Sequence, residues 1–281
     1  MLSILRYIAV VHTFYYTDPM CPWSWAIEPA LRKLAVEFAG ELSMSYVMCG
    51  MAREVGDPTR VVCELLEAAD RSGMPVDARL WLAGPPRSSY PACLAVKAAS
   101  EQGGAGGVLD QYLRRLREGL MCRRRKLDTA DALIEEARAV PGLDVDRLRL
   151  ALGSHAILEA FGADLDRCGA VPPEHRAPGG DRVKLPSLEF VGADGEVRGV
   201  YGPTDYAALR SVLVAAGASP AFAGALSIED ALGRFGSMAT AEVARVCDLP
   251  GPRAPAELWR LALEWRVRPE RVGTDYLWSL A

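Results

Sequence analysis

The chain is poor in residues that bind metals and in segments that cross membranes. Histidine occurs three times in 281 residues, and none is paired with cysteine at zinc-ligand spacing, which argues against a metal site. No segment is long enough and apolar enough to span a bilayer. Residues 1–11 are apolar but are interrupted by Arg6 and lack a small-residue cleavage site. We therefore expect them to lead into the first strand and not to form a signal peptide.

The chain also lacks an excess of positive charge and a regular cysteine framework. Its net charge is −4 and its pI is near 5.6, so it carries no global basic footprint for nucleic acid. Seven cysteines without regular spacing fit a reducing compartment better than a set of disulfides, so we expect a cytoplasmic protein. Half of the residues are hydrophobic, which is enough for one large or two smaller domains.

Residues 13–29 place a cysteine between a strand and a helix. A β-rich run, residues 8–16, ends at the Asp-Pro pair 18–19, and a helix-compatible run opens at Cys21 with proline in its first turn. The first helical turn favours a thiolate because its backbone N–H groups are unpaired. We therefore predict that Cys21 is a nucleophile with a pKa below ~8.5. The alternative is a buried cysteine that fills space.

The residues around Cys21 resemble a known active-site motif. Residues 21–25, Cys-Pro-Trp-Ser-Trp, resemble the motif of the DsbA-like branch of the thioredoxin superfamily, whose usual form is Cys-Pro-x-Cys. The longer string 18–29 is similar to the group that includes the YjbH (SpxH) adaptor proteins. Ser24 stands where the family has its second, resolving cysteine. An internal Cys-x-x-Cys disulfide is therefore excluded here.

The order of the expected elements matches the thioredoxin plan. A helix over residues 21–38, kinked at Pro29, and a strand over 42–49 complete a parallel strand-helix-strand unit. A hairpin at residues 184–201, turning at Asp-Gly, and a helix over 205–216 close the domain. Between them we expect helices over residues 60–71, 89–102, 108–121, 129–139 and 145–159, with a glycine-rich turn at 103–107.

The sequence thus predicts an α/β, thioredoxin-like fold with two additions. We expect a thioredoxin-like domain from residues 8–52 and 183–217, interrupted by an inserted helical domain, residues 53–170. Residues 218–281 are expected to form a C-terminal helical extension, which is either a packing cap or a module that binds a protein partner. Its helices could form a helix-turn-helix, but its basic and acidic residues nearly balance, so we do not expect DNA binding.

The family resemblance implies roles for several further residues. Pro186 matches the superfamily's cis proline beside the cysteine, where Leu185 and Pro186 contact the partner's backbone; the alternative is an ordinary trans proline of an edge strand. Pro22 and Trp23 follow the cysteine, and we expect Trp23 to be exposed to a partner. Trp25 is expected in the core.

Two residues are candidates to assist Cys21. Glu28 lies seven residues later, on the same helical face, where a buried carboxylate with a raised pKa could relay a proton; the alternative is a solvated glutamate. Cys49 ends the second parallel strand, so it could lie on the same sheet edge and resolve a disulfide on Cys21. The alternative is a buried cysteine, and the other five cysteines are assigned to packing or to the surface.

The densest basic cluster lies in residues 114–126. It is interpreted as a solvated face, or as a site for the carboxylates of a small thiol or an acidic peptide. The cluster contains Arg114, Arg115, Arg117, Arg123, Arg124, Arg125 and Lys126.

Two classes of function follow. The first is a thiol-disulfide oxidoreductase or isomerase with a single active-site cysteine, acting on a disulfide- or thiol-bearing protein or a small thiol. It needs no cofactor except a thiol co-substrate such as glutathione. Ser24 also resembles the serine of related glutathione-dependent isomerases, whose hydroxyl steadies a bound thiolate. The second is a non-catalytic adaptor that binds a protein partner through the thioredoxin groove.

Overall fold

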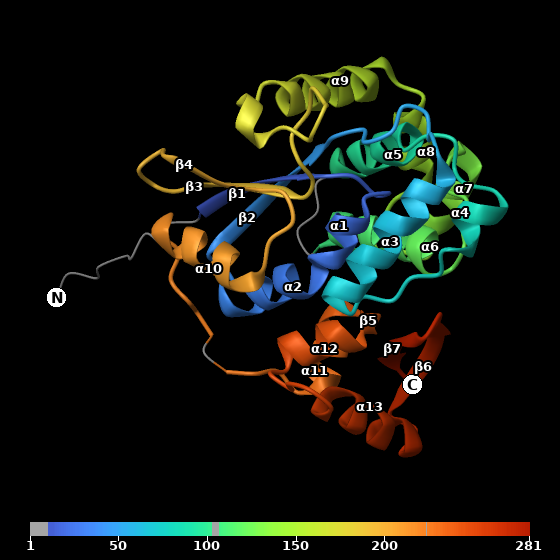
Figure 1. Ribbon diagram of the computed structural model, residues 1–281, viewed down its shortest axis with the longest axis vertical. Helices are drawn as coiled ribbons and strands as arrows, with labels where there is room; N and C mark the ends of the chain where they lie inside the picture. Colours follow the sequence, from blue (N-terminus) through green and yellow to red (C-terminus); the bar gives the residue numbers. More distant parts are fainter. Residues whose placement is uncertain (1–10, 103–106, 223) are drawn as a thin grey trace.

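The computed structural model describes residues 11–102, 107–222 and 224–281. The expected strand residues 8–10 and most of the glycine-rich turn, residues 103–106, lie outside the described residues. Figure 1 shows a central sheet with helices on both faces, a group of helices at one end, and a C-terminal lobe beneath α2 and α3.

The central sheet has four strands in the order β2-β1-β3-β4. β1 and β2 are parallel, with Val11 opposite Leu42, and β3 is antiparallel to both β1 and β4. This arrangement confirms the predicted thioredoxin-like fold and the predicted hairpin. The strands are β1 (Val11–Thr17), β2 (Leu42–Met48), β3 (Ser187–Val191) and β4 (Val197–Tyr201).

Helices cover the two faces of this sheet. One apolar cluster joins Leu34 of α2 (Glu28–Glu37) and Leu213 of α10 (Tyr206–Ala215) to Phe190 of β3. A second cluster joins Cys168 of α9 (His155–Gly169) to Val47 of β2, on the opposite face (Figure 1). Because successive strand residues point to opposite faces, the two clusters use alternate positions of the same strands.

The helix that follows Cys21 is broken and not merely kinked. The structure has a short α1 (Pro22–Ala26) and a separate α2, and the two meet at Ile27. Pro29 lies in the first turn of α2. A proline has no N–H to donate, so it ends one helix but fits the first turn of the next, where no intrahelical bond is lost. The prediction of one helix kinked at Pro29 is therefore wrong, since the chain forms two helices and Pro29 belongs to the second.

The inserted segment is helical, as predicted, with two differences. Helix α4 was not predicted, and the predicted helix 145–159 is divided at Ser154, whose hydroxyl accepts a hydrogen bond from the Ile157 N–H (3.4 Å). The central helix, α5, buries mostly alanines, which lets its neighbours approach closely. The remaining helices are α3 (Pro58–Ser72), α4 (Arg79–Ala83), α5 (Tyr90–Ser100), α6 (Val108–Met121), α7 (Ala130–Ala137) and α8 (Val145–Leu152).

The C-terminal extension contains a sheet as well as helices, so the prediction of a helical extension is incomplete. A hairpin turning at Gly273 (φ +57°) joins the last two strands, and the sheet order is β5-β7-β6. Trp278 packs in the core of the extension, whereas its neighbour Leu277 packs against the inserted helices. The elements are α11 (Ile228–Phe235), β5 (Met238–Ala239), α12 (Thr240–Val246), α13 (Arg253–Leu263), β6 (Val267–Val272) and β7 (Asp275–Leu280).

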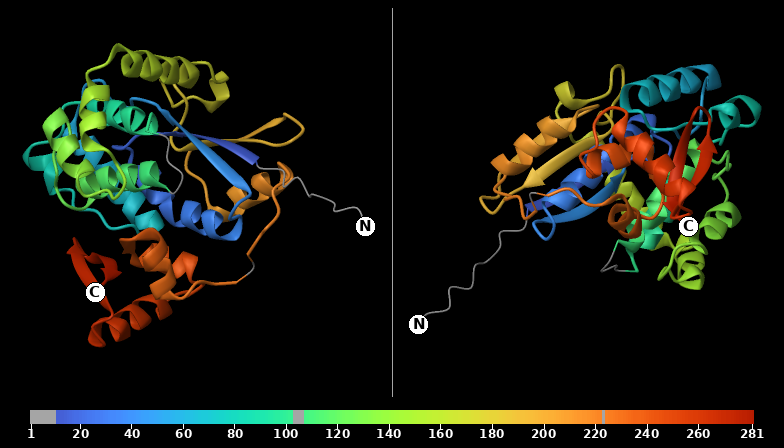
Figure 2. Two further views of the ribbon diagram at one scale, coloured as in Figure 1. Left: turned by 180° about the vertical axis from the view of Figure 1, so that it is seen from behind. Right: turned by 90° about the horizontal axis from the view of Figure 1, so that it is seen from below.

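The extension lies against the rest of the molecule and not apart from it. Figure 2 shows the chain passing from α10 through an extended linker to α11, so that the extension returns beneath the inserted helices. α12 packs along α2, and the Arg123 guanidinium of the insert donates to the Glu270 carboxylate of β6 (2.8 Å). The extension therefore packs against α2 of the thioredoxin-like part and is bonded to Arg123, which lies just after α6.

Candidate functional site

Cys21 lies at the N-terminus of α1, immediately after the loop that leaves β1. It is the N-cap residue of α1, and its sulfur accepts a hydrogen bond from the Ser24 N–H (3.4 Å). The Cys21 N–H donates to the Asp18 carbonyl (3.1 Å), which tightens the loop. These contacts place the thiol where the sequence predicted, at the junction between the strand and the helix.

The environment of this thiol differs from the prediction. Cys21 is only 2% exposed, and burial raises the pKa of its thiol. Hydrogen bonds from Ser24 act in the opposite direction, and the nearby Asp18 carboxylate raises the pKa further. Desolvation outweighs the field of the helix end because α1 has only five residues and the sulfur is shielded from solvent. The predicted lowering of the Cys21 pKa is therefore wrong.

A chain of hydrogen bonds runs from Ser24 into the core. The Thr17 hydroxyl donates to the Ser24 oxygen (2.9 Å), and the Arg117 guanidinium donates to the Thr17 oxygen (2.5 Å). Arg117 in turn pairs with Glu28. All four side chains are buried. The serine that replaces the resolving cysteine is thus connected to a buried ion pair, and Thr17 and Arg117 are site residues that the sequence reasoning missed.

Glu28 is part of this ion pair and does not lie free beneath the thiol. Burial alone would raise the pKa of its carboxyl, but the charges of Arg117, Arg114 and Arg32 outweigh burial and lower it. Arg117 contacts it directly, and an Arg114 nitrogen lies 3.6 Å from its oxygen. The predicted alternatives, a raised pKa for proton relay or a solvated side chain, are both wrong. The lowered pKa favours the ionised form of the Glu28 carboxyl at neutral pH.

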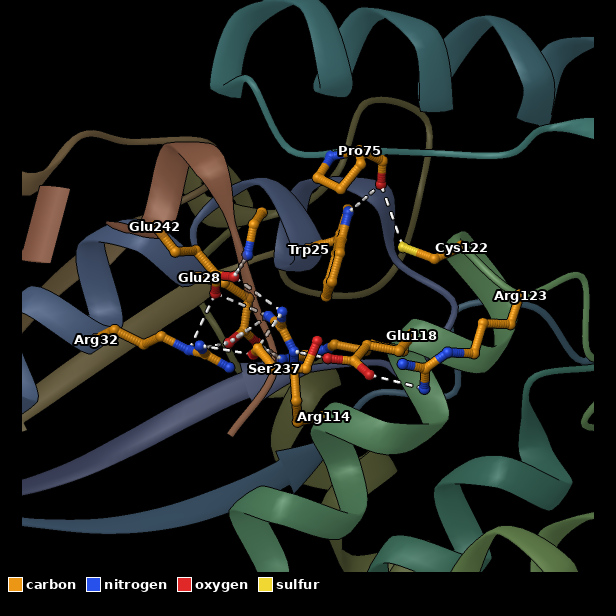
Figure 3. Close-up of polar contacts among 12 residues, drawn as sticks. Trp25, Glu28, Arg32, Pro75, Arg114, Glu118, Cys122, Arg123, Ser237 and Glu242 are labelled. Atoms are coloured by element: carbon orange, nitrogen blue, oxygen red, sulfur yellow. Dashed lines mark hydrogen bonds and ion pairs between the residues drawn. The ribbon is translucent and has the colours of Figure 1, made fainter. Parts of the chain in front are cut away.

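The ion pairs continue from Glu28 into the C-terminal extension (Figure 3). Arg114 of α6 makes two hydrogen bonds to Glu242 of α12 (2.8 Å each), and Arg32 of α2 lies 3.0 Å from the same carboxylate. Arg114 also contacts Glu118 (2.8 Å). A single buried network therefore joins the thioredoxin-like part, the insert and the extension.

The basic cluster at residues 114–126 is only in part the predicted solvated face, since Arg124, Arg125 and Lys126 are exposed whereas Arg114 and Arg117 are buried. Arg114 and Arg117 are 8% and 1% exposed. Each cation of the cluster lies within 3.8 Å of a carboxylate. The partners of the other cations are Glu136 for Arg115 and Arg125, Glu118 and Glu270 for Arg123, Asp77 for Arg124, and Asp128 for Lys126.

Asp18 holds the loop before Cys21 in place. Its buried carboxylate accepts hydrogen bonds from the N–H groups of Met20 (2.8 Å) and Met51 (2.6 Å) and from the Ser89 hydroxyl (2.8 Å). Cys93 donates to it as well (3.3 Å). Burial raises the pKa of Asp18 in spite of these bonds. The motif loop, the loop after β2 and α5 are thus joined at one carboxylate.

Pro186 lies across the sheet from the start of the motif. β1 and β3 are antiparallel with Tyr16 opposite Ser187, so the register carries Pro186 to the position opposite Thr17. Its peptide bond with Leu185 is cis. Pro186 is buried, and Leu185 is half-buried. The two residues therefore adjoin the loop that carries Cys21.

The residues next to Cys21 differ in exposure. Pro22 is buried in the first turn of α1. Trp23 was expected to be exposed but is half-buried, because the Arg71 guanidinium lies over its ring, 5.4 Å from the ring centre. Trp25 is buried, as predicted, and its indole N–H donates to the Pro75 carbonyl (2.9 Å). Trp23 is the aromatic side chain of the motif that keeps an accessible surface.

Cys49 does not face the motif. Its sulfur lies 2.8 Å from the sulfur of Cys168 on α9, within the cluster on the α9 face of the sheet. The adjacent Met48 belongs to the opposite cluster, together with Met20 and Trp25. Because alternate strand residues point to opposite faces, the expected pairing of Cys49 with Cys21 across one edge is wrong.

Two wider searches complete the description. Among the residues that the structure describes, no three His, Cys, Asp or Glu side chains converge as a metal site would require. None of the helices in the described ranges is both long and apolar enough for a membrane span.

The strand order of the central sheet and the cis proline beside β3 define a thioredoxin-like fold, and comparison with known proteins agrees with that fold. Residues 14–168 match the family described as Thioredoxin, and the chain belongs to this family. It is similar to the "ClpXP adapter protein SpxH" of Halalkalibacterium halodurans, with 29% identity over 90% of this chain and 83% of the relative. The SpxH of Shouchella clausii is also 29% identical, over 95% of this chain and 88% of the relative. Both matches span nearly the whole chain.

Solved structures support the fold. A putative protein disulfide isomerase from Nitrosomonas europaea superposes with a TM-score of 0.61 at 18% identity, covering 73% of this chain and 97% of the other. A probable DsbA oxidoreductase from Streptomyces coelicolor gives a TM-score of 0.54 at 16% identity, covering 76% of this chain and 94% of the other.

Proposed function

We propose that this protein is a ClpXP adapter that holds a protein partner on a thioredoxin-like scaffold and does not turn over disulfides. The observation that carries this proposal is the state of the motif: its one cysteine is buried with a raised pKa, and Ser24 occupies the resolving position. The relatives named as ClpXP adapters match 90% and 95% of the chain, which supports the same function. A cytoplasmic location is part of the proposal.

The site is poorly suited to repeated disulfide exchange for two reasons. Exchange begins with attack by a thiolate, and a raised pKa leaves Cys21 protonated at neutral pH. The Ser24 hydroxyl cannot attack a mixed disulfide, and it already accepts a hydrogen bond from Thr17. A mixed disulfide formed on Cys21 would therefore persist until an external thiol reduced it.

Two surfaces suit a protein partner. Trp23, Leu185 and Pro186 surround the motif, and the first two keep accessible surface. The C-terminal extension presents a second, apolar surface on and after α13, where Leu263 is 81% and Trp265 is 87% exposed. Exposed large apolar side chains that lie close together in the chain are typical of sites that bind other proteins.

The form of the extension also favours a protein over DNA. Its α12, α13 and β6–β7 hairpin have the order of a winged helix-turn-helix. However, residues 226–281 carry eight acidic and seven basic side chains, which gives no positive field for phosphates. Glu270 of the hairpin is also paired with Arg123 of the insert, so the hairpin is turned toward the rest of this chain.

A second candidate is a thiol-disulfide oxidoreductase that uses Cys21 alone with glutathione as co-substrate. The Ser24 N–H that points at the Cys21 sulfur favours it, because this donor stabilises a thiolate once the loop opens to water. In that reaction the Cys21 thiolate attacks a substrate disulfide and expels one thiolate. An external thiolate then attacks the mixed disulfide and releases Cys21.

One pair of measurements separates the two candidates. The substrates are proteins that accumulate both in cells lacking this chain and in cells lacking ClpX. Each is purified, and its breakdown by purified ClpXP is followed in three reactions: with the chain, with Cys21→Ser, and without either. We expect both forms to accelerate breakdown, and reduction of a model disulfide by glutathione to stay at background with both. Disulfide turnover that depends on Cys21, without any effect on ClpXP, would overturn the proposal in favour of the second candidate.

A further inference from the structure

Cys49 and Cys168 form a second thiol site, separate from Cys21. Their sulfurs lie 2.8 Å apart although the residues are 119 positions apart in the chain. Both are free cysteines and both are buried, at 2% and 0% exposure. They share a cluster with Tyr16, Val47, Val171 and Val183, on the face of the sheet that α9 covers.

The backbone on each side holds the two sulfurs in this position. The Cys49 N–H donates to the Thr17 carbonyl at the end of β1 (2.9 Å). The Cys168 carbonyl accepts from the Val183 N–H (3.0 Å), which ties the end of α9 to the segment before β3. Because β1 and β3 pair with each other, both cysteines are fixed to the same sheet. Once an oxidant has converted one of two thiols held in this way, the other attacks it at a high effective concentration.

Other buried cysteines of the described chain have partners of a different kind. The Cys93 sulfur donates to the Asp18 carboxylate (3.3 Å), and the Cys122 sulfur donates to the Pro75 carbonyl (3.4 Å). Cys21 accepts from the Ser24 N–H. A disulfide needs its sulfurs to come within ~2.05 Å of each other, a short approach for Cys49 and Cys168.

We propose that Cys49 and Cys168 are a site of oxidation and form an intramolecular disulfide when the protein meets a peroxide or a small disulfide. With hydrogen peroxide, one thiol loses its proton and its sulfur takes one peroxide oxygen to become a sulfenic acid, while the O–O bond breaks and the leaving hydroxide takes up the proton as water. The second thiol loses its proton, its sulfur attacks the sulfenic sulfur to form the S–S bond, and the hydroxide released takes up that proton as a second water. Two thiols are thus oxidised and one peroxide is reduced. With a small disulfide, two exchange steps release two small thiols.

The place of this pair in the fold gives the bond a structural consequence. Cys49 directly follows β2, before the helical insert begins, and Cys168 lies at the end of the last inserted helix, α9. The disulfide therefore closes the insert at its base. The Arg182 guanidinium, which donates to the Cys49 carbonyl (2.9 Å), lies on the loop that covers the pair. Oxidation is expected to be slow, because this loop must open to admit the oxidant and burial raises the pKa of Cys49.

The test treats the full reduced chain with hydrogen peroxide, blocks remaining thiols by alkylation, and maps peptides without reduction. We expect a linked peptide pair containing Cys49 and Cys168, absent from Cys49→Ala and Cys168→Ala. Cys122→Ala is the matched control, since it removes a buried cysteine whose sulfur donates to the Pro75 carbonyl and should leave the linked pair intact. We also expect oxidation to raise the melting temperature by about 5 °C or more, and only in chains that keep both cysteines.

Two further arms make the outcome decisive. The denatured, reduced chain is refolded in a glutathione redox buffer, which removes the barrier of burial. Absence of the linked pair after both native oxidation and refolding would overturn the proposal. In Cys21→Ser the linked pair should form at an unchanged rate; its loss would show instead that Cys49 acts through Cys21, and would overturn the assignment of an independent site. Neither result depends on whether the protein is an adapter.

Discussion

Arg114 and Arg117 lie one turn apart on α6 and stabilise two different parts of the molecule. Arg117 turns toward the motif, where it bonds to Thr17 and Glu28. Arg114 turns toward the extension, where it bonds to Glu242. Both are buried, and both contact Glu28. The comparison shows how a cysteine site and an added module are supported from the same helix, one by each arginine.

The two arginines differ in what their removal leaves behind. Without Arg117, the Thr17 oxygen and Glu28 both lose their nearest cation. Without Arg114, Glu242 keeps Arg32 at 3.0 Å and the Ala239 N–H at 2.6 Å. Without Arg117, Glu28 keeps only the longer contacts with Arg114 (3.6 Å) and Arg32 (4.0 Å). A buried charge that keeps close partners costs less than one left with distant partners. Substitutions at the two positions should therefore differ in size and in the region that they affect.

The largest expected effect belongs to Arg117→Met. The free energy of unfolding should fall by about 3–5 kcal/mol, because Glu28 stays buried without its closest partner. Denaturant unfolding measures it. Adding Glu28→Gln should restore part of the loss, since the uncompensated charge is then gone. A double variant as unstable as the sum of the single variants would mean that the two side chains do not interact.

Arg114→Met should cost less, about 2–3 kcal/mol, since Glu242 keeps its other partners. The effect should concentrate in the extension: backbone hydrogen exchange should accelerate in α12 more than in α1. Arg60→Met is the matched control, because Arg60 forms an exposed pair with Glu64 and should change stability by less than about 0.5 kcal/mol. Equal acceleration in α1 and α12 would contradict the division of roles between the two arginines.

Acid should weaken the network through Glu28. Its pKa is lower in the folded chain than the ordinary value of 4.5, so its contribution to stability is fully present above pH 4.5 and is lost as the pH falls through the folded pKa. Comparing unfolding free energies of the wild type and Glu28→Gln from pH 7 to 3 isolates this group. The difference between the two proteins should shrink below pH 4.5. If the difference in unfolding free energy stayed constant with pH, the ionised Glu28 carboxylate would not be the source of the stability.

Thr17→Val should have the smallest effect, about 1 kcal/mol, because it deletes one hydroxyl while keeping the side-chain shape. The loss of its bond to Ser24 should raise the Cys21 pKa further and slow alkylation of Cys21 at neutral pH. Thr13→Val on the same strand is the control, since the buried Thr13 hydroxyl has no hydrogen-bond partner in the described structure. Peptide mapping after timed alkylation measures the alkylation rate of Cys21 in both variants. An equal rate in both would argue against a role for the hydrogen bond between Thr17 and Ser24.

Much of the central fold was predictable because its signals are local. The β-rich runs, the Asp-Gly turn and the helix caps each depend on residues close in sequence; the Ser227 hydroxyl, for example, accepts a hydrogen bond from the Asp230 N–H three residues later (3.1 Å). The hairpin at the end of the chain was missed although Gly273 lies at its turn. Its buried positions, Val267 and Val272, do not alternate with period two, so the strand pattern is weak.

The sequence by itself determined that one cysteine heads a helix after a strand and that serine takes the place of a second. Those are facts of covalent order, and no packing can change them. Only the tertiary structure decided the state of that cysteine, the partners of Glu28 and the pairing of Cys49 with Cys168. Arg117 is 89 residues from Glu28, and Cys168 is 119 from Cys49. Burial and charge pairing depend on residues brought together from such distances, and these set the pKa values and contacts that local patterns cannot report.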